Sequence, residues 1–199
     1  MAKRTNHYEA AFEEYLRRRQ IAYVAVDEKK RALLGDASLK SLDFIVSTPW
    51  GQSWLVDVKG RQFPSGGQKQ YWKNWSTGDD IRSLTAWQRI FGPSFQGLLV
   101  FAYDVLGNQA PLPAEQLFDF RGRLYGFLGV RLGDYAATAR PISAKWDTLA
   151  MPVRSFRVAA APIEQFFCQT EPPERSELPE FDDFGVSATA EGLAMAGRW

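Results

Sequence analysis

The stretch that most constrains the fold is Ser41–Lys59, SLDFIVSTPWGQSWLVDVK. Two apolar runs flank a Pro/Gly turn signal around Trp50, so the stretch predicts a β-hairpin. If the hairpin turns near Trp50, Asp43 lies about opposite Asp57. Side chains alternate along a strand, so Asp57 and Lys59 point to the same face. The hairpin therefore gathers two carboxylates and one ammonium at one end of a sheet.

This combination of charges has a specific chemistry. Two carboxylates a few ångströms apart repel each other unless a cation lies between them. Mg²⁺ and Mn²⁺ prefer oxygen ligands, keep open positions and bind phosphate oxygens, and a neighbouring lysine can stabilise charge on a phosphodiester. Asp-x-Lys is common in strands, where it usually forms a solvated rim. The flanking residues here are strongly apolar, and charges in such strands are seldom left unpaired. Both a rim and a phosphodiester-hydrolysis site therefore stay open.

The rest of the chain predicts an α/β protein with a mixed sheet and helices on its faces. Helical spacing of apolar residues predicts a first helix over Asn6–Arg19, with Thr5 or Asn6 as its cap. It predicts a second helix that begins at a Thr77 or Asp79 cap and ends at Phe91. Asp79 and Asp80 are better explained as cap and first-turn residues than as metal ligands. We expect further strands at Ile21–Val26, Gln96–Val105, Leu124–Leu132 and Phe156–Ala160, and a closing helix at Pro162–Cys168. Gln96–Val105 is apolar almost throughout, which is typical of a central strand buried on both faces.

Three further features bear on function. Glu9, beside two aromatic residues of the first helix, could lean over the sheet towards Asp43. The connection 27–40, an ordinary surface loop or short helix, carries Lys29, Lys30, Arg31 and Lys40, whose charges could face a nucleic-acid backbone. The aromatic segment 71–75 contains one lysine. Such a segment either packs as a core or loop anchor or stacks on nucleobases.

The distribution of charge and the content of cysteine and histidine indicate the domain division and exclude some kinds of site. The formal net charge of +1 divides into +6 over residues 1–168 and −5 over residues 169–199. We expect 1–168 to be one domain and 169–199 to be a disordered acidic tail, acting as a solubilising linker or as a competitor for the nucleic-acid site. Cys168 and His7 are single, which excludes an internal disulfide and Cys- or His-rich metal sites. The sequence shows no signal peptide and no membrane-spanning run, so the expected location is the cytoplasm and no membrane partner is expected.

The order of elements and the charged residues together resemble the PD-(D/E)xK nuclease superfamily. Asp43 matches the motif aspartate, Asp57 and Lys59 match the (D/E)xK pair, and Glu9 matches the glutamate of the first helix. Leu42 stands where a proline often precedes the motif aspartate. The arrangement is most similar to the archaeal Holliday-junction-resolvase and Mrr-like branch, and the match covers about residues 6–105. Separately, His7–Glu13 resembles the motif that names the HYExAFE family of uncharacterised bacterial proteins, which implies no activity.

The nuclease resemblance implies a restriction-endonuclease-like core of helix, three-strand meander, helix and strand, with extra C-terminal strands. It implies Mg²⁺- or Mn²⁺-dependent cleavage of nucleic acid, DNA more than RNA, and it makes a homodimer an option. Asp43, Asp57 and the Val58 carbonyl would hold the metal, with Glu9 as a direct or water-mediated ligand, and Lys59 would orient the attacking water. From strand parity alone, Arg61 could contact a phosphate. The alternative is a non-catalytic nucleic-acid- or protein-binding module that keeps the fold.

Overall fold

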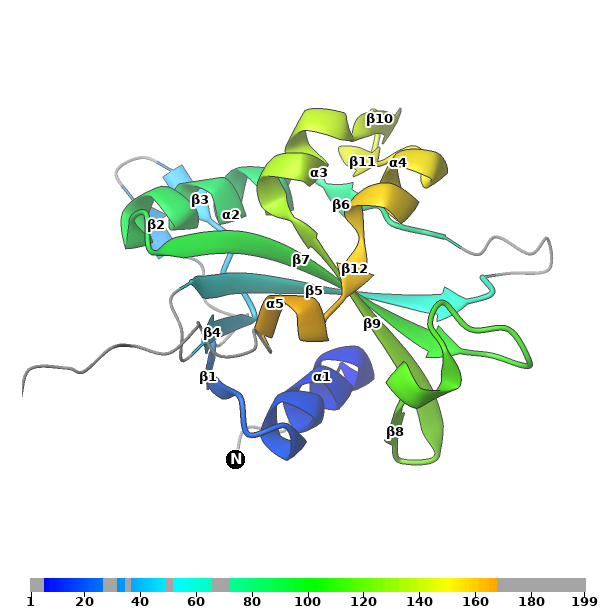
Figure 1. The fold of residues 1–199 in the computed structure, drawn as a ribbon. Coiled ribbons are helices and arrows are strands. Elements are labelled where there is room, and N and C mark those ends of the chain that lie inside the picture. The colour runs from blue at the N-terminus through cyan, green and yellow to red at the C-terminus, as the bar shows by residue number, and fades with distance from the viewer. Residues whose placement is uncertain (1–5, 27–31, 35–36, 49–51, 66–71, 168–199) are drawn as a thin grey trace, which may run out of the picture.

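The computed structural model describes residues 6–26, 32–34, 37–48, 52–65 and 72–167 (Figure 1). The helices are α1 (His7–Arg18), α2 (Gly78–Phe91), α3 (Leu132–Thr138), α4 (Val153–Ala159) and α5 (Glu164–Phe167), with a 3-10 turn η1 (Ala114–Gln116). The strands are β1 (Ala22–Ala25), β2 (Ala32–Leu34), β3 (Ala37–Leu39), β4 (Phe44–Ser47), β5 (Ser53–Phe63), β6 (Ser76–Thr77), β7 (Phe95–Val105), β8 (Phe118–Phe120), β9 (Arg123–Arg131), β10 (Arg140–Ser143), β11 (Thr148–Ala150) and β12 (Ala161–Pro162).

The described strands form one main mixed sheet in the order β1-β4-β5-β7-β9-β12, with β8 added beside β9. β1, β4 and β5 are antiparallel neighbours, whereas β5 and β7 run parallel over their full length and are joined through α2. β7 pairs antiparallel with β9 on its other side, so the apolar strand is central, as its sequence predicts. The order of helix, three-strand meander, helix and strand is the restriction-endonuclease-like core that the sequence predicts.

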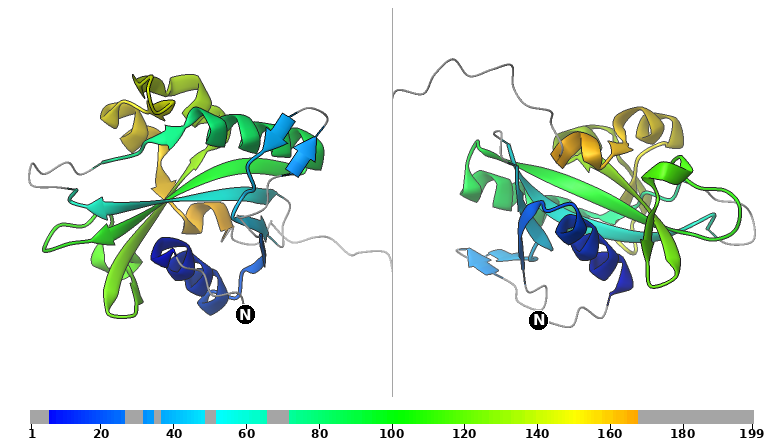
Figure 2. Two further views of the ribbon diagram at one scale, coloured as in Figure 1. Left: turned by 180° about the vertical axis from the view of Figure 1, so that it is seen from behind. Right: turned by 60° about the horizontal axis from the view of Figure 1, so that its bottom comes forward.

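Helices cover both faces of the main sheet, as two further views show (Figure 2). On one face, α1 and α5 pack on a core that includes Phe12, Val56 and Val58. On the other face, α2, α3 and α4 cover a second core that includes Leu55 and Phe101. The side chains of β5 thus alternate between the two cores, with even-numbered residues facing α1 and odd-numbered residues facing α2.

Both long helices begin at a capping residue that their sequence indicates. The Asn6 side chain accepts a hydrogen bond from the Tyr8 amide at the start of α1, at 3.1 Å. At the start of α2, Thr77 and Asp80 form a capping box, in which each side chain accepts a hydrogen bond from the other residue's amide. Since α2 follows β6 directly, this box fixes where the helix begins over the sheet.

Two predicted elements differ from the structure. Phe156–Ala160, predicted as a strand, belongs to helix α4, because Phe156 reaches the core from one side of a short helix and packs on Phe101 with ring centroids 5.1 Å apart. The connection 27–40, predicted as a loop or short helix, contains the strand pair β2–β3 in its described part.

The acidic segment 169–199 lies outside the described residues. None of the helices within the described ranges has the length and apolar character needed to cross a membrane.

Candidate active site on strand β5

Asp43 lies where the sequence places it, at the end of the β4–β5 pair. Its amide donates to the Val56 carbonyl at 2.9 Å, and Phe44 pairs with Val56 in the ladder, so Asp43 lies opposite Asp57. The Asp43 carboxylate accepts a hydrogen bond from the Val58 amide at 2.6 Å. In a β-strand, the amide and the carbonyl of one residue point towards the same neighbouring strand. The Val58 carbonyl therefore points to the edge where β4 has ended.

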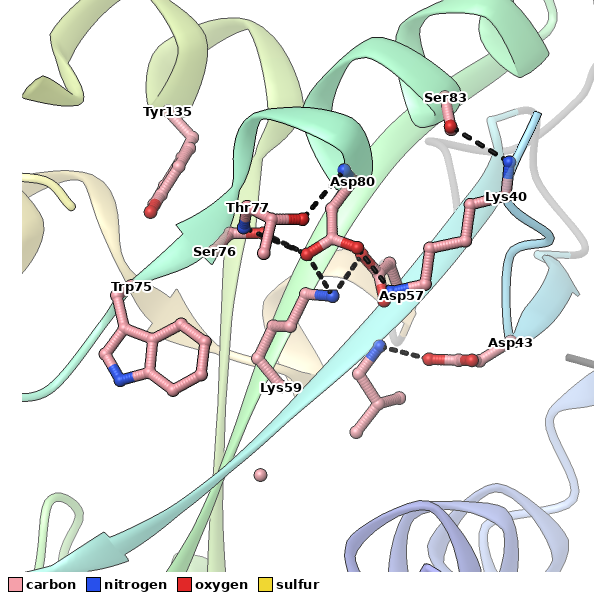
Figure 3. Close-up of polar contacts among 12 residues, drawn as sticks. Lys40, Asp43, Asp57, Lys59, Trp75, Ser76, Thr77, Asp80, Ser83 and Tyr135 are labelled. Atoms are coloured by element: carbon pink, nitrogen blue, oxygen red, sulfur yellow. Dashed lines mark hydrogen bonds and ion pairs between the residues drawn. The ribbon is translucent and has the colours of Figure 1, made fainter. Parts of the chain in front are cut away.

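Asp57 and Lys59 share the α2-facing side of β5 and form a buried ion pair (Figure 3). The Lys59 Nζ atom lies 2.7 Å from Asp57 Oδ2 and 2.8 Å from Asp80 Oδ2. The side chains of all three residues keep 11% or less of their surface exposed. A solvated rim is excluded for this pair, because both charges lie beneath helix α2.

Asp80, in the first turn of α2, bonds the Asp57–Lys59 pair to that helix, and these three residues are called the Lys59 cluster below. Its carboxylate accepts hydrogen bonds from the Ser76 hydroxyl and the Thr77 amide, each at 3.0 Å, as well as from Lys59. Its second oxygen accepts a hydrogen bond from the half-exposed ammonium of Lys40. Four donors on one buried carboxylate hold it in a single position, and two of these donors carry a positive charge.

The cluster shifts the pKa values of its members in different directions. Burial raises the pKa of the Asp57 carboxyl, and the nearby Lys59 ammonium only partly opposes this. Burial also disfavours the charge on Lys59, but Asp57 and Asp80 outweigh it and raise the lysine pKa above its usual value. For Asp80, burial is outweighed by Lys59 and by the hydrogen bond from Lys40, so its pKa is lowered. At neutral pH, Lys59 is thus a charged ammonium and Asp80 a carboxylate.

A shallow cavity of about 10 Å³, room for about one water molecule, lies beside the cluster. It is lined by Lys40, Ser41, Leu42, Asp57, Asp80, Ser83, Leu84 and Trp87. The backbone of Lys40 is tied to α2 at both ends, since its amide donates to the Ser83 hydroxyl at 3.0 Å and its carbonyl accepts from the Trp87 indole at 2.8 Å. The segment entering β4 is therefore held against α2, and Asp57 is reached from this cavity.

Glu9 does not form a metal-holding group with the two aspartates among the described residues. It is buried on α1, where its carboxylate accepts a hydrogen bond from the Asn6 side chain. Helices α1 and α2 lie on opposite faces of the sheet (Figure 1). Val56 and Val58 face α1, so Asp57 and Lys59 face the other side. Among the described residues, no three or more His, Cys, Asp or Glu side chains are grouped closely enough to hold a metal ion. Asp57 and Asp80 thus meet at Lys59, whereas Asp43 is bonded to the Val58 amide at the edge of β5.

The residues predicted to contact nucleic acid differ in exposure, and some of them lie outside the described ranges. Arg61 shares the face of Lys59, as strand parity predicts, but it is only 9% exposed and its guanidinium donates to the carbonyls of Gly60 and Trp75. Lys40 reaches Asp80 and keeps 44% of its side-chain surface exposed. Lys29, Lys30 and Arg31 lie outside the described residues. A phosphate contact by any of these five residues stays a prediction.

Sequence reasoning explained Asp80 as a helix cap and missed its second role. The capping role is correct, because Asp80 accepts the Thr77 amide at 3.0 Å. Its contact with Lys59 depends on the parallel pairing of β5 with β7, which places the start of α2 over β5. The Ser76-Thr77-x-x-Asp80 pattern could have indicated this second role. It is a helix-capping pattern next to the predicted sheet, where one aspartate can both cap the helix and pair with a lysine on a strand.

No protein-family model matches the sequence, and no curated protein matches it either. Among solved structures, the fold is similar to that of Hjc, a Holliday junction resolvase from the archaeal hyperthermophile Archaeoglobus fulgidus. The two chains are 10% identical, the TM-score is 0.45, and the similarity covers 80% of this chain and 97% of that chain. A similarity at this level carries no inference about activity. Membership of the resolvase and Mrr-like branch, or of the HYExAFE family, stays a prediction.

Proposed function

We propose that this chain is a metal-dependent nuclease that hydrolyses phosphodiester bonds of nucleic acid, with DNA ahead of RNA. The observation that carries the proposal is the buried Asp57–Lys59 pair, with Nζ and Oδ2 2.7 Å apart on one face of β5. Asp43 immediately precedes β4 and lies opposite Asp57, where its carboxylate accepts from the Val58 amide. Buried charged residues usually have an ion-pair partner or a functional role. Two carboxylates and one ammonium, as in Asp43, Asp57 and Lys59, are the groups that metal-dependent phosphodiester hydrolysis needs.

The residues at the end of β4 fit Mg²⁺ or Mn²⁺. Asp43, Asp57 and the Val58 carbonyl offer oxygen donors only, which these two ions prefer. Mg²⁺ usually keeps several waters, so two carboxylates and one carbonyl are a sufficient protein contribution. When bound, the ion supplies Lewis-acid stabilisation of the charged phosphate. Glu9 was expected in this set as a direct or water-mediated ligand, and that role stays a prediction.

Lys59 serves this reaction as a fixed positive charge. Because Asp57 and Asp80 raise its pKa, Lys59 keeps its proton at neutral pH. It therefore acts as a donor to a phosphate oxygen or to the attacking water, rather than as a base. Its contact with Asp80, 2.8 Å long, would keep the ammonium in place if Asp57 held a cation. Asp80 thus positions Lys59 without needing to touch the substrate.

The test is cleavage of labelled single-stranded, duplex and branched DNA, and of RNA, with Mg²⁺ or Mn²⁺. Wild type is expected to cleave at least one of these substrates only when the metal is present, and Asp57→Asn is expected to be inactive. The metal should also raise the melting temperature of wild type but not of Asp57→Asn, because a ligand stabilises the state that binds it. Metal-independent cleavage, or equal cleavage by Asp57→Asn, would contradict the proposal. A result with neither cleavage nor metal stabilisation would favour the alternative, a non-catalytic nucleic-acid- or protein-binding module that keeps the fold.

A further inference from the structure

The segment 72–75 is firmly anchored, yet it leaves one tryptophan at the surface. Trp72 packs edge-on against Phe63, with ring centroids 5.4 Å apart. The Asn74 side chain bridges both backbone groups of Met151, accepting from its amide at 2.9 Å and donating to its carbonyl at 3.1 Å. Trp75 follows directly and keeps 39% of its surface exposed. Core anchoring therefore explains Trp72 and Asn74 but does not explain Trp75.

A buried arginine supports the exposed indole of Trp75. The guanidinium carbon of Arg61 lies 3.8 Å from the centre of the Trp75 ring. Arg61 is 9% exposed and is held by hydrogen bonds to the carbonyls of Gly60 and Trp75. A cation stacked on one face of the ring fixes its orientation. Trp75 is thus a rigid aromatic surface that needs little reordering to receive a flat partner.

This aromatic surface lies next to the Lys59 cluster. Arg61 follows Lys59 by two positions on the same face of β5, a spacing of about 7 Å. Ser76, the residue after Trp75, donates from its hydroxyl to the Asp80 carboxylate that holds Lys59. Figure 3 shows the indole of Trp75 on the same side of β5 as the Lys59 side chain. A nucleotide that adjoins a phosphate at Lys59 is therefore within reach of Trp75.

We propose that Trp75, supported by Arg61, is a stacking surface for an unpaired nucleobase next to the phosphate that Lys59 contacts. This inference rests on the proposed nuclease function and names its substrate class. Aromatic rings stack on every base, so the contact is insensitive to sequence. A base inside a duplex is already stacked and must be extruded at a cost before it reaches a protein ring. The preferred substrate is therefore a single strand or a branched nucleic acid with an unpaired base at the cleavage site.

The test measures binding separately from cleavage. Fluorescence anisotropy compares a labelled oligothymidylate with a duplex of equal length, in EDTA so that no metal-dependent reaction occurs. We expect wild type to bind the single strand more tightly than the duplex. Trp75→Ala should weaken single-strand binding by about tenfold and duplex binding by much less, and Trp75→Phe should keep most of the affinity. Melting curves of both variants verify that they are folded.

Trp146 provides a matched control, because it is 70% exposed and lies in the turn between β10 and β11. Trp146→Ala is expected to stay within about twofold of wild type. The inference is overturned if wild type binds single strands no better than duplex, if Trp75→Ala has no effect, or if Trp146→Ala loses as much affinity. If wild type cleaves but Trp75→Ala binds normally, only this inference fails. If single-strand binding depends on Trp75 and wild type does not cleave, the nuclease proposal fails and the stacking surface stands.

Discussion

Replacing Asp80 by asparagine is the perturbation that best separates the structural and chemical roles of the ion-pair cluster. Asp80→Asn keeps a side-chain oxygen that can accept the Thr77 amide, so the start of α2 is preserved. It removes the charge that neutralises Lys59 and Lys40. Losing one partner of a buried ion pair costs about 3–5 kcal/mol. Here the cost is reduced, because Lys59 keeps Asp57 at 2.7 Å.

The Lys40 contact adds little to this cost, because its side chain is 44% exposed and such pairs are worth about 0–1 kcal/mol. We therefore expect Asp80→Asn to lower the free energy of unfolding by about 2–3 kcal/mol. For a domain of this size that corresponds to a fall in melting temperature of roughly 4–12 °C. Urea unfolding at pH 7 measures the free energy. The matched control is Asp134→Asn, which changes an exposed carboxylate in the first turn of α3 and should cost less than about 1 kcal/mol.

The loss of stability in Asp80→Asn also depends on pH. The pKa of Asp80 is lowered in the folded state, whereas in the unfolded chain it is near the usual value of about 3.9. As the pH falls, the unfolded state takes up a proton first, so the contribution of Asp80 is present above that value and is lost below it. The difference between wild type and variant should therefore shrink in acid. A difference that is independent of pH, or no larger than that of Asp134→Asn, would refute the ion-pair account.

Two further substitutions test how the sheet is packed around the site. In Gly60→Ala, the new Cβ atom would overlap ring atoms of Tyr8, so the Tyr8 ring or α1 must shift and stability should fall by about 1–3 kcal/mol. Gly133→Ala, with nothing within 4 Å of the added atom, should be neutral or stabilising, and equal losses for both in thermal melting would contradict this packing. Tyr135→Phe removes a buried hydroxyl that can donate its proton either to the Asn74 carbonyl at 2.8 Å or to the Leu149 carbonyl at 2.9 Å. We expect a loss of about 1–3 kcal/mol by urea unfolding, and no loss would show that this bond does not hold the segment before α2.

The local part of the fold and site could be predicted from the sequence. The apolar alternation and the Pro/Gly turn in 41–59 determine the β4–β5 register, so Asp43 lies opposite Asp57 as predicted. Because β5 carries apolar residues on both faces, a one-residue slip would have turned the charged side chains of Asp57 and Lys59 into the apolar core beneath α1, which is why the register can be predicted from this strand pair. The position of Lys59 beside Asp57 follows from the same alternation.

Features that depend on distant packing could not be predicted. Helical periodicity shows which side of α1 is buried, but it does not show that the helix covers the face opposite to Asp57 and Lys59. The approach of Glu9 to Asp43 stays a prediction. The meeting of Asp80 with Lys59 arises from the parallel β5–β7 pairing across a long connection. The short apolar run at 156–160 fits a strand and a buried helix equally well from its pattern alone, and the structure has a helix.

The central claim is that the buried ammonium of Lys59 acts on a phosphodiester. The most direct measurement is the single-turnover cleavage rate of Lys59→Ala at saturating Mg²⁺, compared with wild type and with Lys40→Ala. Lys40 contacts the same Asp80 carboxylate but is half exposed, so it controls for loss of positive charge near the site. We predict that Lys59→Ala is slower than wild type by about 10²–10³-fold, while Lys40→Ala stays within about tenfold. Equal rates for Lys59→Ala and wild type would contradict the claim.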